Sequence, residues 1–112
     1  MKNRRYAVAS VIAAAAFAAL FMVLPSKGAG REIKIVGLQY RPAAFTIAAG
    51  DAVTFENDTT LTHTATCRGC RQDSGDIQPR TFKTLTFPKA GRYLIFCRYH
   101  GAAGMAATLT VR

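Results

Sequence analysis

Apolar and polar residues alternate in short segments from residue 31 to the end of the chain, and turn residues such as Gly50 and Gly91 separate these segments. A period of two is typical of a strand with one buried face, whereas residues 31–112 show no helical period. The pattern therefore predicts an all-β domain, a small Greek-key sandwich of two sheets with about seven short strands. The polar stretch 68–79 is predicted to be a long loop. The predicted inward-facing residues are Ile33, Ile35, Phe45, Ile47, Val53, Phe55, Tyr93, Ile95, Cys97, Met105, Ala107, Leu109 and Val111.

Residues 1–30 have the composition of an export segment. A basic start with Lys2, Arg4 and Arg5 precedes an apolar run at 7–24, and small residues follow at 28–30. This order is typical of a signal peptide, and the run is also long enough to predict an N-terminal membrane-anchor helix. Because the run is rich in alanine, which partitions weakly into lipid, a cleaved signal is favoured. We therefore expect an exported, periplasmic domain at 31–112, with membrane contact only if residues 7–24 are retained.

The length of 112 residues suits one domain, and the chain is strongly basic. Of its 15 basic and 6 acidic residues, four basic and no acidic ones lie in residues 1–30, which leaves residues 31–112 with a formal charge of +5. Such an excess favours docking to acidic surfaces of partner proteins. An exported domain without a basic stripe interleaved with aromatic residues does not favour nucleic acid as a partner. We expect a monomer that meets its partners transiently.

Four residues form a candidate metal site. Cys97, His100 and Met105 have the spacing Cys-x2-His-x4-Met between two predicted strands, and His63 is the other histidine of the chain. A thiolate, two imidazoles and a thioether are the ligands expected of a blue (type 1) copper site, because soft sulfur suits cuprous ion and nitrogen suits cupric ion. Zinc is less suited, since a thioether adds little to its binding. Each residue alone would be an ordinary buried side chain, but together they indicate copper.

The same residues lie in segments that resemble the cupredoxins, the blue copper proteins, and specifically their plastocyanin-like branch. Residues 32–57 are similar to the family's opening strands, residues 62–64 to the segment of its first histidine ligand, and residues 91–97 to the strand that enters its copper loop. The most specific element is the Cys-x2-His-x4-Met spacing with Gly-Ala-Ala-Gly inside it. The resemblance implies a cupredoxin-like sandwich that holds one type 1 copper ion by His63, Cys97, His100 and Met105.

Three further residues are expected around this copper ion. By the resemblance, Asn57 is the asparagine that ties the first-ligand segment to the Cys97 loop, and Thr64 directly follows the first histidine ligand. Tyr99 departs from the plastocyanin pattern, which has proline before the second histidine. Unlike proline, Tyr99 has a backbone N–H, which we expect to donate a second hydrogen bond to the Cys97 sulfur and so to raise the reduction potential.

Cys67 and Cys70 form a Cys-x2-Cys pair outside this resemblance. If Cys97 binds the metal, an oxidising compartment favours a local disulfide between the other two cysteines. Two alternatives stay open. One is a second thiolate site that loads or stores copper, and the other is a redox-active pair, although the pattern predicts no helix of the kind that usually carries one.

Two functions fit these observations. The leading interpretation is an exported carrier of single electrons between larger redox proteins, not an enzyme. His100 would be the electron exit, at a flat apolar patch of residues 42–44 and 101–104. The alternative is a periplasmic copper-handling protein, a carrier, store or metallochaperone, that also uses Cys67 and Cys70. A metal-free adhesion sandwich would leave the four candidate ligands unexplained.

Overall fold

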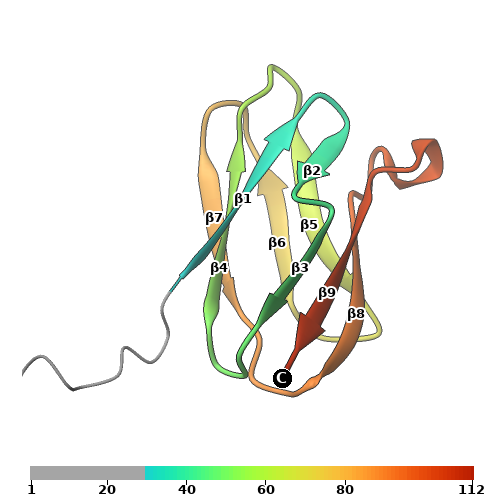
Figure 1. The fold of residues 1–112 in the computed structure, drawn as a ribbon. Helices are drawn as coiled ribbons and strands as arrows, with labels where there is room; N and C mark the ends of the chain where they lie inside the picture. Colours follow the sequence, from blue (N-terminus) through green and yellow to red (C-terminus); the bar gives the residue numbers. More distant parts are fainter. Residues whose placement is uncertain (1–29) are drawn as a thin grey trace, which may run out of the picture.

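Two β-sheets pack face to face in the computed structural model, which describes residues 30–112 (Figure 1). One sheet has the strand order β2-β1-β4-β7, and the other has the order β3-β9-β8-β5-β6. One turn of 3-10 helix, η1 (Gly101–Ala103), lies between β8 and β9. The strands are β1 Arg31–Val36, β2 Gln39–Arg41, β3 Ala44–Ile47, β4 Ala52–Asn57, β5 His63–Arg68, β6 Asp73–Ile77, β7 Phe82–Thr86, β8 Gly91–Phe96 and β9 Ala106–Val111.

The alternation predicted from the sequence is confirmed. Ile33 and Ile35 of β1 and Val53 and Phe55 of β4 are fully buried, while the residues between them are partly exposed. β9 alternates in the same way and buries every second residue. The inner faces of the two sheets therefore form one apolar core between them, as a sandwich requires.

The sandwich differs from the prediction in its number of strands and in the segment 68–79. It has nine strands rather than about seven, because β2 has only 3 residues and is too short to show alternation. The predicted loop is partly wrong, since it contains β6. This strand buries only Ile77 completely. It forms because its backbone pairs with β5 at the edge of the five-stranded sheet. Hydrogen bonds between backbones do not depend on side chains, so the sequence of β6 shows no alternation of apolar and polar residues.

The pairing of β5 with β8 determines where the candidate ligands lie. The two strands are antiparallel, with Thr66 opposite Phe96 and Cys67 opposite Ile95. In such a pair the start of one strand lies beside the end of the other. His63, the first residue of β5, and Cys97, which directly follows β8, therefore come to the same end of the sandwich. The loop at 97–105 lies at this end, at the upper right in Figure 1.

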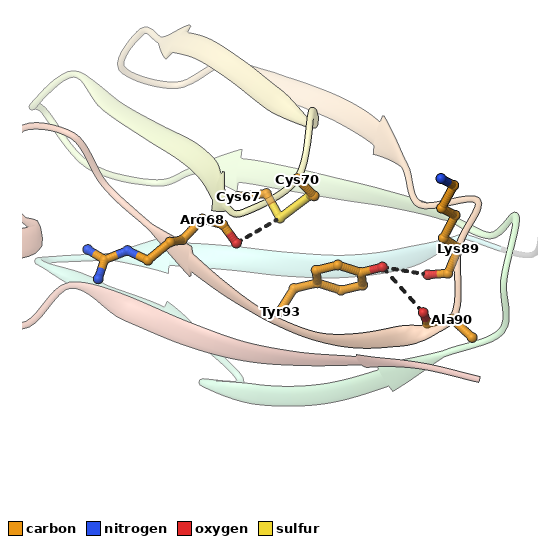
Figure 2. Close-up of a disulfide and its surroundings, with 6 residues drawn as sticks. All are labelled: Cys67, Arg68, Cys70, Lys89, Ala90 and Tyr93. Carbon is orange, nitrogen blue, oxygen red and sulfur yellow. Dashed lines mark hydrogen bonds between the residues drawn. A yellow bond between two sulfur atoms is a disulfide. The ribbon is translucent and has the colours of Figure 1, made fainter.

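At the other end of the same strand pair, Cys67 and Cys70 form a disulfide (Figure 2). It links the end of β5 to the turn before β6, with the two Cα atoms 5.4 Å apart. Cys67 lies in the apolar core, and Cys97 is the free cysteine of the described residues. Of the three roles considered for this cysteine pair, the structure therefore has the local disulfide.

The predicted signal or anchor segment, with its apolar run at 7–24, lies outside the described residues, which begin at Gly30. β1 begins at Arg31, the first residue of the predicted domain. Within residues 30–112, no helix is long and apolar enough to span a membrane.

Candidate metal centre

Three of the four predicted ligands converge where β5 begins and β8 ends. Cys97 Sγ lies 3.8 Å from His63 Nδ1 and 3.6 Å from His100 Nδ1. The ligand atoms of the three residues all lie within 4.8 Å of one another, and residues 30–112 contain no other such group of His, Cys, Asp or Glu side chains. His63 and Cys97 are fully buried, whereas His100 is partly exposed.

Backbone hydrogen bonds fold the loop at 97–105 into a closed turn. The Gly101 amide donates to the Cys97 carbonyl at 2.7 Å, and the Cys97 amide donates to the Met105 carbonyl at 3.2 Å. The Met105 amide donates to the His100 carbonyl at 3.3 Å, just after Gly104 has turned the chain through the left-handed region (φ 93°). Met105 is fully buried at the end of this loop. Its role as the fourth ligand stays a prediction.

A chain of hydrogen bonds orients the His63 ring. His63 Nε2 lies 3.0 Å from Thr59 Oγ1, and the Thr59 hydroxyl donates to Asn57 Oδ1 at 2.7 Å. Because the Thr59 hydroxyl donates to Asn57, its oxygen accepts a hydrogen bond from His63 Nε2. The lone pair of His63 is then on Nδ1, the nitrogen that faces Cys97 Sγ. A hydrogen bond to the second ring nitrogen is the usual way in which a metal-binding histidine is oriented.

Thr64, rather than Asn57, makes the expected tie between the His63 segment and the Cys97 loop. The Thr64 amide donates to Cys97 Sγ at 3.4 Å, and the Arg98 amide donates to Thr64 Oγ1 at 2.9 Å. Asn57 ends β4 in the other sheet, and its side-chain amide donates to carbonyls of the β4–β5 loop and of β6. The reason is strand pairing, since Thr64 lies on β5, which is the neighbour of β8. Asn57 reaches the His63 side chain through Thr59.

Arg98 and Tyr99, which lie between two predicted ligands, contact β6 through their side chains. The Tyr99 hydroxyl donates to Asp76 Oδ1 at 2.5 Å, and the Arg98 guanidinium pairs with Asp73. The expected hydrogen bond from the Tyr99 amide to the Cys97 sulfur is not made. Across residues 30–112, the Thr64 amide is the one backbone donor to that sulfur. The side chain of Tyr99, not its amide, therefore holds this segment.

Sequence reasoning missed Tyr40, Asp73 and Asp76. Tyr40 is buried on β2, and its hydroxyl donates to the Thr64 carbonyl at 2.5 Å, across the gap between the two sheets. Burial raises the pKa of Tyr40 above its usual range, and the neighbouring Cys97 raises it further, so the hydroxyl keeps its proton for this bond. The contacts of these three residues with Tyr99, Thr64 and Arg98 join residues that are 23, 24 or 25 positions apart. No local sequence pattern marks contacts at that separation.

The electrostatics of the group suit a metal that prefers sulfur and nitrogen. Burial lowers the pKa of His63, and the adjacent His100 lowers it further, because two neighbouring cations repel. A neutral imidazole is the form in which histidine binds metals. A buried thiol that faces two imidazoles, with no carboxylate in the group, is the donor set that fits copper.

The comparison with protein families agrees with this donor set. The model of a family described as copper binding proteins, plastocyanin/azurin family, matches residues 29–112. The chain belongs to this family. Copper is therefore the cofactor of this cupredoxin, and the group of His63, Cys97 and His100 fits it.

Individual cupredoxins resemble this one at low sequence identity. Plastocyanin A/B of Petroselinum crispum is 29% identical over an alignment of 86 residues, and the match covers 67% of this chain and 89% of that protein. The structure of amicyanin from Paracoccus versutus superposes with a TM-score of 0.65 at 23% identity, over 81% of this chain and 87% of amicyanin. A reduced amicyanin variant gives a TM-score of 0.67 at 22% identity, over 79% and 86% of the two chains. At this identity the structures show that the fold is shared.

Proposed function

We propose that this cupredoxin is an exported carrier of single electrons between two larger redox proteins. The observation that supports it best is the arrangement of the donor atoms, in which one buried sulfur faces two imidazole nitrogens at 3.6 and 3.8 Å. Copper bound by such a set supplies one-electron chemistry, because it is stable in both the cuprous and the cupric state. Membership of a copper-binding family supports the identity of the metal.

Four residues hold the copper: His63, Cys97 and His100 are the close ligands, and Met105 is the weak fourth ligand. The convergence of the first three supports their roles. The burial of Met105 and the hydrogen bond of its carbonyl to the Cys97 amide support the fourth. Because backbone hydrogen bonds close the loop at 97–105, its ligands stay in place when the charge of the site changes, and an electron is transferred with little rearrangement.

His100 is the electron exit. It is partly exposed, whereas the other two close ligands are fully buried, so it is the ligand next to solvent. Exposed small residues follow it at 102–104. The segment 42–44 adjoins β9, the strand that follows the loop at 97–105, because the Thr108 amide donates to the Ala43 carbonyl at 2.8 Å. Small side chains around the exit allow the close and brief docking that transient electron transfer requires.

Export and acidic partners complete the proposal. A disulfide persists in an oxidising compartment, so the bond between Cys67 and Cys70 supports a location outside the cytoplasm. The composition of residues 1–30 supports the same location. The excess of basic residues in 31–112 supports donor and acceptor proteins with acidic docking surfaces.

The copper-handling alternative has lost the feature that supported it. That function required free thiols at Cys67 and Cys70, and the two sulfurs are joined in a disulfide. The disulfide also lies at the end of the β5–β8 pair opposite the metal centre. With this disulfide formed, Cys97 is the one free thiol of residues 30–112, which leaves no thiol pair there to receive copper.

A copper titration followed by electron exchange tests the electron-carrier function. The purified protein should bind one cupric ion per chain and develop an intense visible band from thiolate-to-copper charge transfer. It should then exchange electrons reversibly in voltammetry. A copper form without this band would contradict the proposal. So would a protein that passes cuprous ion to a chelator faster than it passes electrons to a redox partner.

A further inference from the structure

The two residues between Cys97 and His100 contact β6, a strand that provides none of the candidate copper ligands. Arg98 pairs with Asp73, and Tyr99 donates to Asp76 at 2.5 Å. Both carboxylates belong to β6, the edge strand of the five-stranded sheet. One strand thus contacts two consecutive residues of the segment that joins two copper ligands.

A β-bulge makes this double contact possible. Residues three apart on a regular strand point to opposite faces of the sheet, so Asp73 and Asp76 would not face the same loop. β6 pairs Asp76 with Thr64 but Asp73 with Thr66, so it has one residue more than β5 in this interval. Gly75, within the bulge, has a φ of 65°, in the left-handed region that favours glycine. The bulge lets both carboxylates face the copper loop.

Asp73 also closes a ring of hydrogen bonds that includes Thr64. The Arg98 amide donates to Thr64 Oγ1 at 2.9 Å, the Thr64 and Thr66 hydroxyls lie 2.9 Å apart, and the Thr66 hydroxyl donates to Asp73 at 3.1 Å. Because Thr66 gives its proton to Asp73, Thr64 donates to Thr66 and accepts from Arg98. The Arg98 guanidinium completes the ring at Asp73. The bonds that lead from the Arg98 amide through Thr64 and Thr66 to Asp73 run in one direction, and such bonds strengthen one another. The ring reaches the metal centre because the Thr64 amide donates to Cys97 Sγ.

The charge state of Asp73 agrees with this arrangement. Burial by itself would raise the pKa of Asp73, but the Gly75 amide, the Arg98 guanidinium and the Thr66 hydroxyl lower it below its usual range. The side chain is therefore an ionised carboxylate that accepts hydrogen bonds from all three groups.

We propose that Asp73 and Asp76 are positioning residues of the copper site, a role that rests on the proposed electron-carrier function. By holding Arg98 and Tyr99, they keep the segment between Cys97 and His100 against β5. The Arg98 side chain is 49% exposed and Tyr99 is 54% exposed. Exposed ion pairs contribute little to folding stability. Loss of the Arg98 and Tyr99 contacts with β6 therefore changes the placement of Cys97 and His100 more than it changes the melting temperature. This is typical of residues that orient metal ligands without binding the metal.

Two double variants test this role. Each replaces one arginine and one tyrosine, in one case just after the end of β8 and in the other near its start. Arg98→Met with Tyr99→Phe removes both side-chain contacts to β6 and leaves the backbone hydrogen bonds in place. Arg92→Met with Tyr93→Phe is the matched control. It also removes one cation and one phenol hydroxyl, which here donates to two carbonyls of the β7–β8 turn (Figure 2). Both variants are measured with copper bound and at high ionic strength, which screens the lost charge.

Asp76 provides a second, independent pair of variants. Asp76→Asn keeps an oxygen that accepts a hydrogen bond from Tyr99, whereas Asp76→Ala removes it. The Asn variant should match the wild type, and the Ala variant should show part of the defect of the Arg98→Met/Tyr99→Phe protein. A purely structural role would not separate the two variants in the electron paramagnetic resonance (EPR) spectrum of the cupric form.

The Arg98→Met/Tyr99→Phe protein should bind one copper and melt at the temperature of its control. Its electron self-exchange rate should be about tenfold lower than that of the control, the lower end of the effect of groups behind metal ligands. Its cupric EPR spectrum should also differ. Equal rates and equal EPR spectra in the two double variants would overturn the positioning role. If the copper-loaded wild type exchanged no electrons, the electron-carrier function would fail instead, and the EPR comparison alone would decide the positioning role.

Discussion

The two ends of the β5–β8 pair are held together by different kinds of bond. At the metal end, His63, Cys97 and His100 bring three donor atoms within 4.8 Å of one another, and hydrogen bonds order the backbone around them. At the other end, a covalent bond between Cys67 and Cys70 joins β5 to the turn before β6. The first end is ordered to receive a metal, and the second is closed without one.

This difference separates a conditional from a permanent contribution to stability. Copper stabilises the folded protein only while it is bound, whereas a disulfide restricts the unfolded chain at all times. The arrangement also preserves the reactive sulfur. Because Cys67 and Cys70 are bonded to each other at the far end, Cys97 stays free and buried at the metal end.

Replacing the sulfur at the metal end should have the largest effect. Cys97→Ser should abolish the intense visible band and lower the melting temperature of the protein with copper to that of the protein without it, because a hydroxyl cannot replace the thiolate ligand. The control is Cys67→Ser with Cys70→Ser, which should keep the band. A Cys97→Ser protein that stayed equally coloured would refute the ligand assignment.

Removing copper should loosen one end and spare the other. A ligand bound only by the folded state stabilises it by about 4 kcal/mol at about 1,000 times its dissociation constant. Thermal unfolding measures the total loss, and amide hydrogen exchange locates it. Exchange should accelerate in the loop at 97–105 and stay unchanged beside Cys67 and Cys70. Equal melting temperatures with and without copper would contradict this expectation.

Opening the disulfide should destabilise the protein less than copper removal does, and it should affect the segment beside Cys67 and Cys70 rather than the copper site. The ring that it closes is short, so Cys67→Ser with Cys70→Ser should lower the free energy of unfolding by about 1–3 kcal/mol and leave the copper spectrum intact. Denaturant titration and the visible spectrum check the two halves of this statement. The copper-free wild type should titrate with one free thiol, that of Cys97. Three free thiols with a second bound cuprous ion would restore the copper-handling function.

Two tyrosine hydroxyls allow a finer comparison of the ends. Tyr40→Phe should cost about 1 kcal/mol, because the Thr64 carbonyl loses a buried donor. It should also shift the visible band, since the Thr64 amide donates a hydrogen bond to the Cys97 sulfur. Tyr93→Phe removes a hydroxyl at the disulfide end and should leave the band unchanged. Equal spectra for the two variants would show that Thr64 does not transmit the change.

The smallest expected effect is a dependence on acid at the metal end. The pKa of Asp73 is lower in the folded protein than in the unfolded chain. Its contribution to stability is therefore present above about pH 3.9, the ordinary aspartate pKa, and is lost as the pH falls through the lower folded value. In the copper-free protein, Asp73→Asn should remove this part of the loss. An unchanged slope of stability against pH would argue against the Arg98–Asp73 pair.

Much of the core and the nearness of Cys97 to His100 could be predicted from local spacing. Alternation over a few residues marks an inner face, as for Ile33 and Ile35, because successive side chains of a strand point to opposite sides. Cys97 and His100 are three residues apart on one loop, so a turn directly after β8 is enough to bring them together. His63 could be predicted as a ligand only as the one remaining imidazole of the chain, and the structure places its ring beside Cys97 and His100.

The groups that support the ligands were decided by tertiary structure. Whether Asn57 or Thr64 meets the Cys97 loop depends on which strand pairs with β8, and a sequence without an alignment contains no signal for that choice. β6 was missed for the same reason, because backbone pairing holds it and its polar residues show no period. Its bulge then turns Asp73 and Asp76 to the copper loop. Local chemistry thus predicts which residues bind copper, whereas strand register, a property of segments far apart in the chain, decided which groups surround them.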